Sequence, residues 1–124
     1  MQTNQEIFTT IKNHLLQQNL VSKEYRLCYL KNSHGLKCAI GCLIPDDLYS
    51  PSLEMNGGLD TNQELVNILE SIGIQLRDPN FSYLNKTLTY KMLLELQSIH
   101  DNLDPQYWSN ALANIAIKYN LNYN

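Results

Sequence analysis

The chain has 124 residues, a net charge of −3 and a hydrophobic fraction of 44%. This length is close to the commonest size of a single domain, and the apolar content is sufficient for one hydrophobic core. No run of apolar residues is long enough to span a bilayer, and the N-terminal residues lack the basic start and apolar stretch of a signal peptide. We therefore predict one soluble domain, residues 1–124, and no membrane association.

The cysteine content points to a reducing compartment. There are three cysteines, and an odd number without an export signal argues against a disulfide framework. The expected location is the cytoplasm, so the Asn-X-Ser/Thr triplets at Asn80 and Asn85 are interpreted as chance occurrences.

The charges are unevenly distributed along the chain. Four bases lie close together at Lys23, Arg26, Lys31 and Lys37, whereas residues 38–76 contain six acids and no base. A protein that binds duplex nucleic acid normally carries a basic footprint over a whole face. Duplex nucleic acid is therefore an improbable partner, and a protein or a small anionic ligand near residues 23–37 is favoured.

The N-terminal third predicts a helix followed by a hairpin. Thr3 and Glu6 form a capping box, and the apolar residues that follow at helical spacing predict a helix ending near Asn19. Residues 25–30 are rich in aromatic side chains, residues 31–35 have turn chemistry, and residues 36–40 alternate in polarity. A symmetric turn places Leu30 opposite Leu36 and Cys28 opposite Cys38.

The rest of the chain predicts three more helices. Residues 46–49 suggest a short helical turn and residues 51–59 an exposed loop. A second capping box, Thr61 and Glu64, precedes a helix that ends at Gly73. The two last helices are expected to pack against each other, with Asp104 as the N-cap of the final one. Their apolar faces are Leu88, Met92, Leu96, Ile99 and Leu103 in the third helix, and Trp108, Leu112, Ile115 and Tyr119 in the fourth. The predicted fold class is α+β, mainly α, with about four helices packed around a small β-hairpin.

The cysteines permit a zinc site or inert packing. Zinc needs four converging ligands, and the available set is Cys28, Cys38 and Cys42 with His100 or His34. The sequence has no CxxC knuckle, and free cysteines are commonly small buried hydrophobes, which is the favoured interpretation. We therefore expect no cofactor, with zinc as the alternative.

A cysteine-dependent enzyme is the second alternative. It would use Cys38 or Cys42 as the nucleophile and His100 as the base, with a carboxylate to orient the base. Asp101 lies about 100° around the helix from His100, so Asp104, one turn further on, is the better orienting partner. The competing interpretation is that His100 is a structural residue at a helix end.

The basic hairpin is the favoured binding site. Tyr25, Arg26, Tyr29, Lys31 and Lys37 combine charge with aromatic rings and are suited to a partner or an anionic ligand. The alternative is a solvated face over a core strand.

Two segments resemble a group of small proteins of bacteria and their phages. They are GLKCAIGCLIPD at residues 35–46 and LQSIHD at residues 96–101, followed by Trp108, and residues 5–8 and 14–16 are also similar. No activity is established for this group, whose members often carry Asp or another polar residue in place of His34. The resemblance implies that Cys28, Cys38, Cys42, His100 and Asp101 belong to a family pattern, maintained by packing or by chemistry.

These observations favour a small binding or accessory protein, encoded by a phage or prophage, that engages a protein or a small anionic ligand. An anti-defence role is an expectation by association with such genes.

Overall fold

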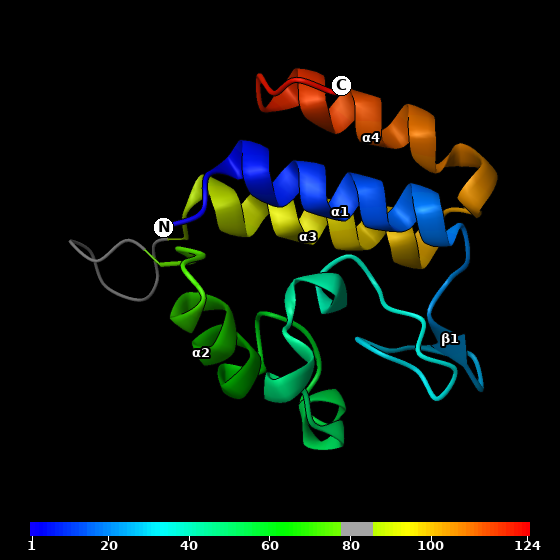
Figure 1. Ribbon diagram of the computed structural model, residues 1–124, viewed down its shortest axis with the longest axis vertical. Coiled ribbons are helices and arrows are strands. Elements are labelled where there is room, and N and C mark those ends of the chain that lie inside the picture. Colours follow the sequence, from blue (N-terminus) through cyan, green and yellow to red (C-terminus); the bar gives the residue numbers. More distant parts are fainter. Residues whose placement is uncertain (78–85) are drawn as a thin grey trace.

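The computed structural model describes residues 1–77 and 86–124, so Asn80 and Asn85, the acceptor residues of the two triplets, lie outside the described residues. Its helices are α1 (Asn4–Gln18), α2 (Gln63–Ser71), α3 (Leu88–Asn102) and α4 (Trp108–Lys118), shown in Figure 1. The strands β1 (Lys23–Glu24) and β2 (Leu27–Cys28) form a small antiparallel sheet. The described residues also form four short 3-10 helices: η1 (Gly41–Leu43), η2 (Asp46–Leu48), η3 (Pro51–Glu54) and η4 (Pro105–Tyr107). The predicted mainly α, α+β class is confirmed.

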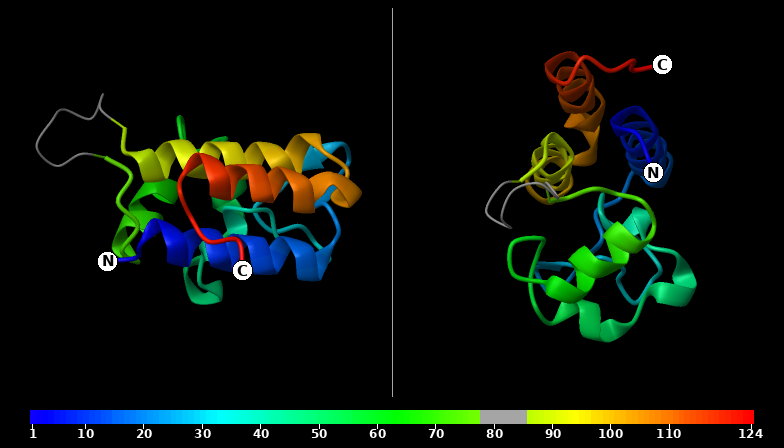
Figure 2. Two further views of the ribbon diagram at one scale, coloured as in Figure 1. Left: turned by 90° about the horizontal axis from the view of Figure 1, so that it is seen from above. Right: turned by 90° about the vertical axis from the view of Figure 1, so that its left-hand side faces the viewer.

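The long helices form one layer of the molecule. Helices α1, α3 and α4 contact one another (Figure 2), and Figure 1 shows them above α2, the 3-10 helices η1 to η3 and the hairpin, whereas η4 connects α3 to α4. The expected packing of α3 against α4 is confirmed. Fully buried side chains fill the layer, including Phe8, Leu15, Met92, Leu96 and Trp108. In the described ranges, no helix combines the length and the apolar character needed to cross a membrane.

The helix ends agree in part with the sequence. The first capping box is confirmed: the Glu6 N–H donates to Thr3 Oγ1 at 3.1 Å, and the Thr3 N–H donates to Glu6 Oε1 at 3.0 Å. The second is wrong, because Asn62 caps α2 by accepting the Leu65 N–H at 3.0 Å. Thr61 instead donates its hydroxyl to the Asn56 carbonyl oxygen at 2.6 Å.

The junction between α3 and α4 also differs from the expectation. Asp104 precedes the 3-10 helix η4 and makes no side-chain capping bond, and α4 begins only at Trp108. Trp108 is fully buried, as predicted. The predicted stripe of α3 is buried only at Met92, Leu96 and Ile99. Leu88, the first residue of α3, is 63% exposed, and Leu103, which follows the helix, is 38% exposed.

The predicted hairpin register is wrong. Glu24 pairs with Leu27, so the hairpin turn is the dipeptide Tyr25-Arg26. Further on, an isolated bridge pairs Lys31 with Lys37, which shifts Leu30 and Cys28 away from their predicted partners. Asn32 sets this alignment, because its Oδ1 accepts the N–H groups of His34 at 3.0 Å and Leu36 at 2.9 Å. Such a side-chain-closed turn cannot be seen in a polarity pattern.

The segment that carries the resemblance is part of the core. Cys38, Ala39 and Ile40 are buried, as are Leu43 and Ile44 after them. Gly41 lies so close to the backbone of Leu30 that a Cβ atom on it would be 1.9 Å from the Leu30 carbonyl oxygen. Packing in the core therefore explains most of the residue types in this segment.

Candidate functional site

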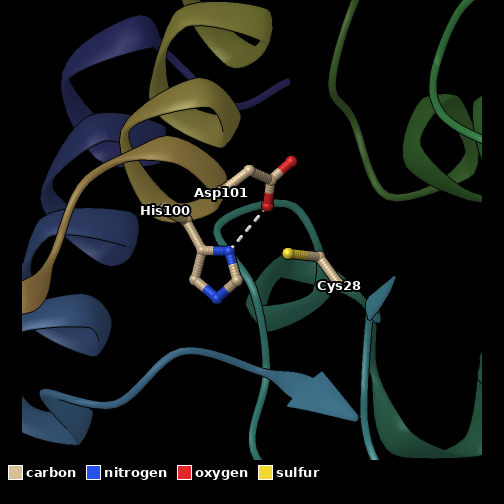
Figure 3. Close-up of side chains that lie close together, drawn as sticks. All are labelled: Cys28, His100 and Asp101. Carbon is tan, nitrogen blue, oxygen red and sulfur yellow. Dashed lines mark hydrogen bonds and ion pairs between the residues drawn. The ribbon is translucent and has the colours of Figure 1, made fainter. Parts of the chain in front are cut away.

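Three side chains of types that bind metals or take part in catalysis lie close together where β2 approaches the end of α3. The thiol of Cys28, the imidazole of His100 and the carboxylate of Asp101 have ligand atoms within 4.8 Å of one another. Figure 3 shows His100 and Asp101 on the last turns of α3, facing Cys28 on the hairpin. We refer to these three residues as the Cys28 cluster.

Both ring nitrogens of His100 are used within the chain. The Ser22 N–H donates to His100 Nε2 at 2.9 Å, and His100 Nδ1 lies 2.8 Å from Asp101 Oδ1. A backbone N–H can only donate, so Nε2 must provide its lone pair and the proton of the neutral ring resides on Nδ1, from which it is donated to Asp101. The ring is fully buried and stacks on Trp108, with centroids 5.7 Å apart and planes at 28°.

The orienting carboxylate is Asp101, and the sequence-based choice of Asp104 is wrong. That choice assumed that the helix continues for one turn beyond His100. Helix α3 ends at Asn102, and Leu103 is extended with ψ 146°, so Asp104 is not one helical turn away.

Asp101 is held by a second donor from its own helix. Gln97 donates its Nε2 to Asp101 Oδ1 at 2.8 Å and accepts the Ile40 N–H on its own Oε1 at 3.0 Å. Burial alone would raise the pKa of Asp101, but the hydrogen bonds from His100 and Gln97 outweigh it and hold this pKa below its ordinary value. The resulting network connects α3 to the backbone at residues 22 and 40, which is a structural role.

The three thiols are not activated as nucleophiles. Cys38 is buried and accepts the Gly41 N–H on its sulfur at 3.2 Å, and burial raises its pKa to about 12. Burial also raises the pKa of Cys42 to about 12, and the Cys42 thiol donates to the Ala39 carbonyl oxygen at 3.0 Å. Cys28 is exposed, yet partial burial and the neighbouring Asp101 carboxylate raise its pKa too. Catalytic cysteines need the opposite shift.

The structure does not bring together the ligand set considered for zinc. In the described part of the chain, neither Cys38 nor Cys42 belongs to a group of three ligands, and His34 is exposed in a turn. The Cys28 cluster also fits a metal poorly. A metal on His100 Nδ1 would force the proton onto Nε2, directly opposite the Ser22 N–H donor.

We expect slow alkylation of every thiol at neutral pH. Iodoacetamide should modify Cys28 first, because it is the exposed cysteine, but more slowly than it modifies glutathione at pH 7. The rate should rise with pH, since the raised pKa keeps Cys28 protonated at pH 7. Mass spectrometry of the modified protein measures this, with the urea-unfolded chain as the control. A thiol that reacts faster than glutathione at pH 7 would restore the enzyme hypothesis.

The residues of the basic hairpin separate into three environments. Tyr25 is 91% exposed and Arg26 is exposed beside it. The Nζ atoms of Lys31 and Lys37 lie 3.8 Å and 2.9 Å, respectively, from Asp46 Oδ1. This carboxylate partly neutralises both charges. Tyr29 is half-buried and lines a pocket next to Cys28.

Sequence reasoning missed the contributions of Ser22 and Gln97. Gln97 and Asp101 are four residues apart on one helix, a spacing at which side chains meet, so this pair was detectable. The contact of Ser22 with His100 spans 78 positions. No local pattern indicates such a contact.

Comparison of the chain with models of known protein families gives no match. Comparison with curated proteins gives no significant match. Comparison with solved structures gives no significant match either.

Proposed function

We propose that this chain is a binding protein that engages a protein partner through the tip of its β-hairpin. The observation that carries the proposal is the backbone of the two-residue turn. Tyr25 has φ 50° and Arg26 has φ 69°, so both turn residues are in the left-handed region.

This conformation is costly for these residue types. A two-residue hairpin turn with positive φ at both positions strongly favours Asn-Gly and related pairs. A residue other than glycine in such a conformation costs about 1 kcal/mol or more. Among the described residues, no hydrogen bond, ion pair or ring contact to the Tyr25 or Arg26 side chain offsets this cost within the chain.

The exposed chemistry of the tip suits a protein surface. Tyrosine and arginine are the residue types enriched among the energetically dominant residues of protein interfaces, along with tryptophan. Leu27, directly after the turn, is 61% exposed and extends the apolar part of the tip. We name Tyr25, Arg26 and Leu27 the hairpin tip.

The charges around the tip favour a protein over a small anionic ligand. Lys31 and Lys37 are paired with Asp46, so two of the bases expected to hold an anion are already engaged. The acidic Asp101 lies next to Cys28, close to the tip. A surface with both signs of charge around exposed aromatic and aliphatic groups is typical of protein interfaces.

Site-specific photo-crosslinking tests the proposal. Benzoylphenylalanine in place of Tyr25 should crosslink a partner in cells that produce the chain. The same group in place of Tyr107, which is 54% exposed on η4, should not. With the captured protein purified, Tyr25→Ala and Arg26→Ala should each weaken its affinity about 30-fold or more, whereas Tyr107→Ala should leave it unchanged. Equal affinities for all three variants would contradict the proposal.

A further inference from the structure

A small pocket lies beside the hairpin tip. Its volume is about 230 Å³, and its walls come from the hairpin at Cys28 and Tyr29, the loop at Gly57 and Gly58, and α3 at Asp101. Pockets for drug-sized ligands begin at roughly 300 Å³. This pocket therefore has room for a single side chain or a molecule of that size.

The pocket is lined by acids and by no base. Its charged lining residues are Glu54 and Asp101. Both oxygens of Glu54 are occupied: Oε1 accepts the Leu30 N–H at 2.9 Å, and Oε2 accepts the Lys31 N–H at 3.1 Å and the Tyr49 hydroxyl at 2.6 Å. Glu54 thus contributes negative charge and no free acceptor.

Asp101 provides the open acceptor. Its Oδ1 accepts hydrogen bonds from His100 and Gln97. The Cys28 thiol also interacts with this carboxylate and lowers its pKa. Within residues 1–77 and 86–124, no backbone, amide or imidazole group donates to Oδ2. In Figure 3 this second oxygen points away from His100. The side chain is 33% exposed, so a ligand can reach it. The network that orients Asp101 thus leaves one oxygen of a positioned carboxylate free for a ligand.

We propose that this pocket binds the ammonium group of a lysine side chain presented by the partner. The lining has two carboxylates and no base, which favours a cation. Lys23 pairs with Cys28 in the sheet but does not line the pocket. A guanidinium binds best to both oxygens of a carboxylate, and here one of them is saturated. An ammonium is a compact charge that needs only one oxygen. The apolar residues that line the pocket, including Leu30, Ile40 and Leu65, suit the methylene groups of a lysine side chain.

A lysine analogue tests the pocket without the partner. The probe is Nα-acetyl-lysine amide, its uncharged control is Nα-acetyl-norleucine amide, and the readout is the NMR shifts of the Gly57 and Gly58 amides. We expect saturable shifts with a Kd of about 1–10 mM for the lysine amide. The norleucine amide should give none, and Nα-acetyl-arginine amide should bind more weakly. Equal binding of lysine and norleucine amides, or tighter binding of the arginine amide, would overturn the assignment.

Variants connect the shifts to Asp101. Asp101→Asn removes the charge and should weaken the lysine amide at least tenfold, whereas Asp104→Asn, outside the pocket, should not. If Asp101→Asn alters the fold, as judged from its amide spectrum, Cys28→Met provides a second variant. It narrows the pocket and keeps the charge, so it should also weaken the probe at least tenfold. Unchanged affinity in a folded variant of either kind contradicts the inference.

This inference rests on the proposed function, because the partner would supply the lysine. The experiments nevertheless distinguish failure of the lysine pocket from failure of the hairpin interface. If the tip variants lose affinity for the partner but the lysine amide does not bind, only the lysine pocket is contradicted. If the lysine amide binds in an Asp101-dependent way but the tip variants bind the partner normally, only the hairpin interface is contradicted.

Discussion

Gly41→Ala should lower the free energy of unfolding by about 3 kcal/mol. A Cβ atom at this position would be 1.9 Å from the carbonyl oxygen and 2.7 Å from the carbonyl carbon of Leu30. These are backbone atoms, so no side-chain rotation can relieve the overlap. The Leu30 carbonyl also accepts the Cys38 N–H at 3.3 Å, and displacing it would break that bond. Urea unfolding measures the loss.

Gly35→Ala is the matched control for this variant. Gly35 has φ +80° and no heavy atom within 4 Å of an added Cβ, so its substitution carries only the backbone cost of about 1 kcal/mol. The pair separates the two costs, because Gly35 has a positive φ and no crowding, whereas Gly41 is crowded and has no positive φ. Equal destabilisation of both would show that the segment at residues 38–44 is not held as tightly as the structure indicates.

His100→Ala should destabilise the protein by about 3 kcal/mol. The substitution removes a buried ring that stacks on Trp108 and leaves the buried Ser22 N–H without its acceptor. It also removes one of the two donors to Asp101 Oδ1. Thermal or urea unfolding measures the change.

His34→Ala is the control for His100, because His34 is exposed in the turn at residues 32–36. Its substitution should change the free energy of unfolding by less than about 0.5 kcal/mol. If His100→Ala is as stable as the wild type, His100 would instead be a residue retained for its chemistry and not for stability. That outcome would contradict the structural role assigned to His100.

The sequence predicted the features that depend on local periodicity. The capping box of α1, the end of that helix near Asn19 and the burial of Trp108 follow from spacing along one helix, and all three are confirmed. The pairing of α3 with α4 follows from their short connection.

The features that depend on distant backbone groups were not predictable. The hairpin register depends on which N–H groups Asn32 accepts, and the pairing of His100 with Asp101 rather than Asp104 depends on where α3 ends. The composition of the Cys28 cluster depends on contacts across more than 70 positions, including the one between Ser22 and His100. Sequence patterns indicated the right residue types but paired them incorrectly.

The hairpin tip shows a conflict between local preference and the fold. Natural sequences mostly agree with their structure at every level, and exceptions concentrate at functional positions. Tyr25 and Arg26 are such an exception, since the turn they form favours smaller residues. Their retention is explained if the side chains contact a partner.

The most direct test of this explanation is the free energy of unfolding of the double variant Tyr25→Asn, Arg26→Gly. These substitutions introduce the pair that the turn prefers, and Glu24 and Leu27 keep their pairing. We expect the free energy of unfolding of the double variant to be about 1 kcal/mol higher than that of the wild type. A less stable variant would show that Tyr25 and Arg26 already stabilise the hairpin within the chain, and the strained turn would then no longer indicate a partner.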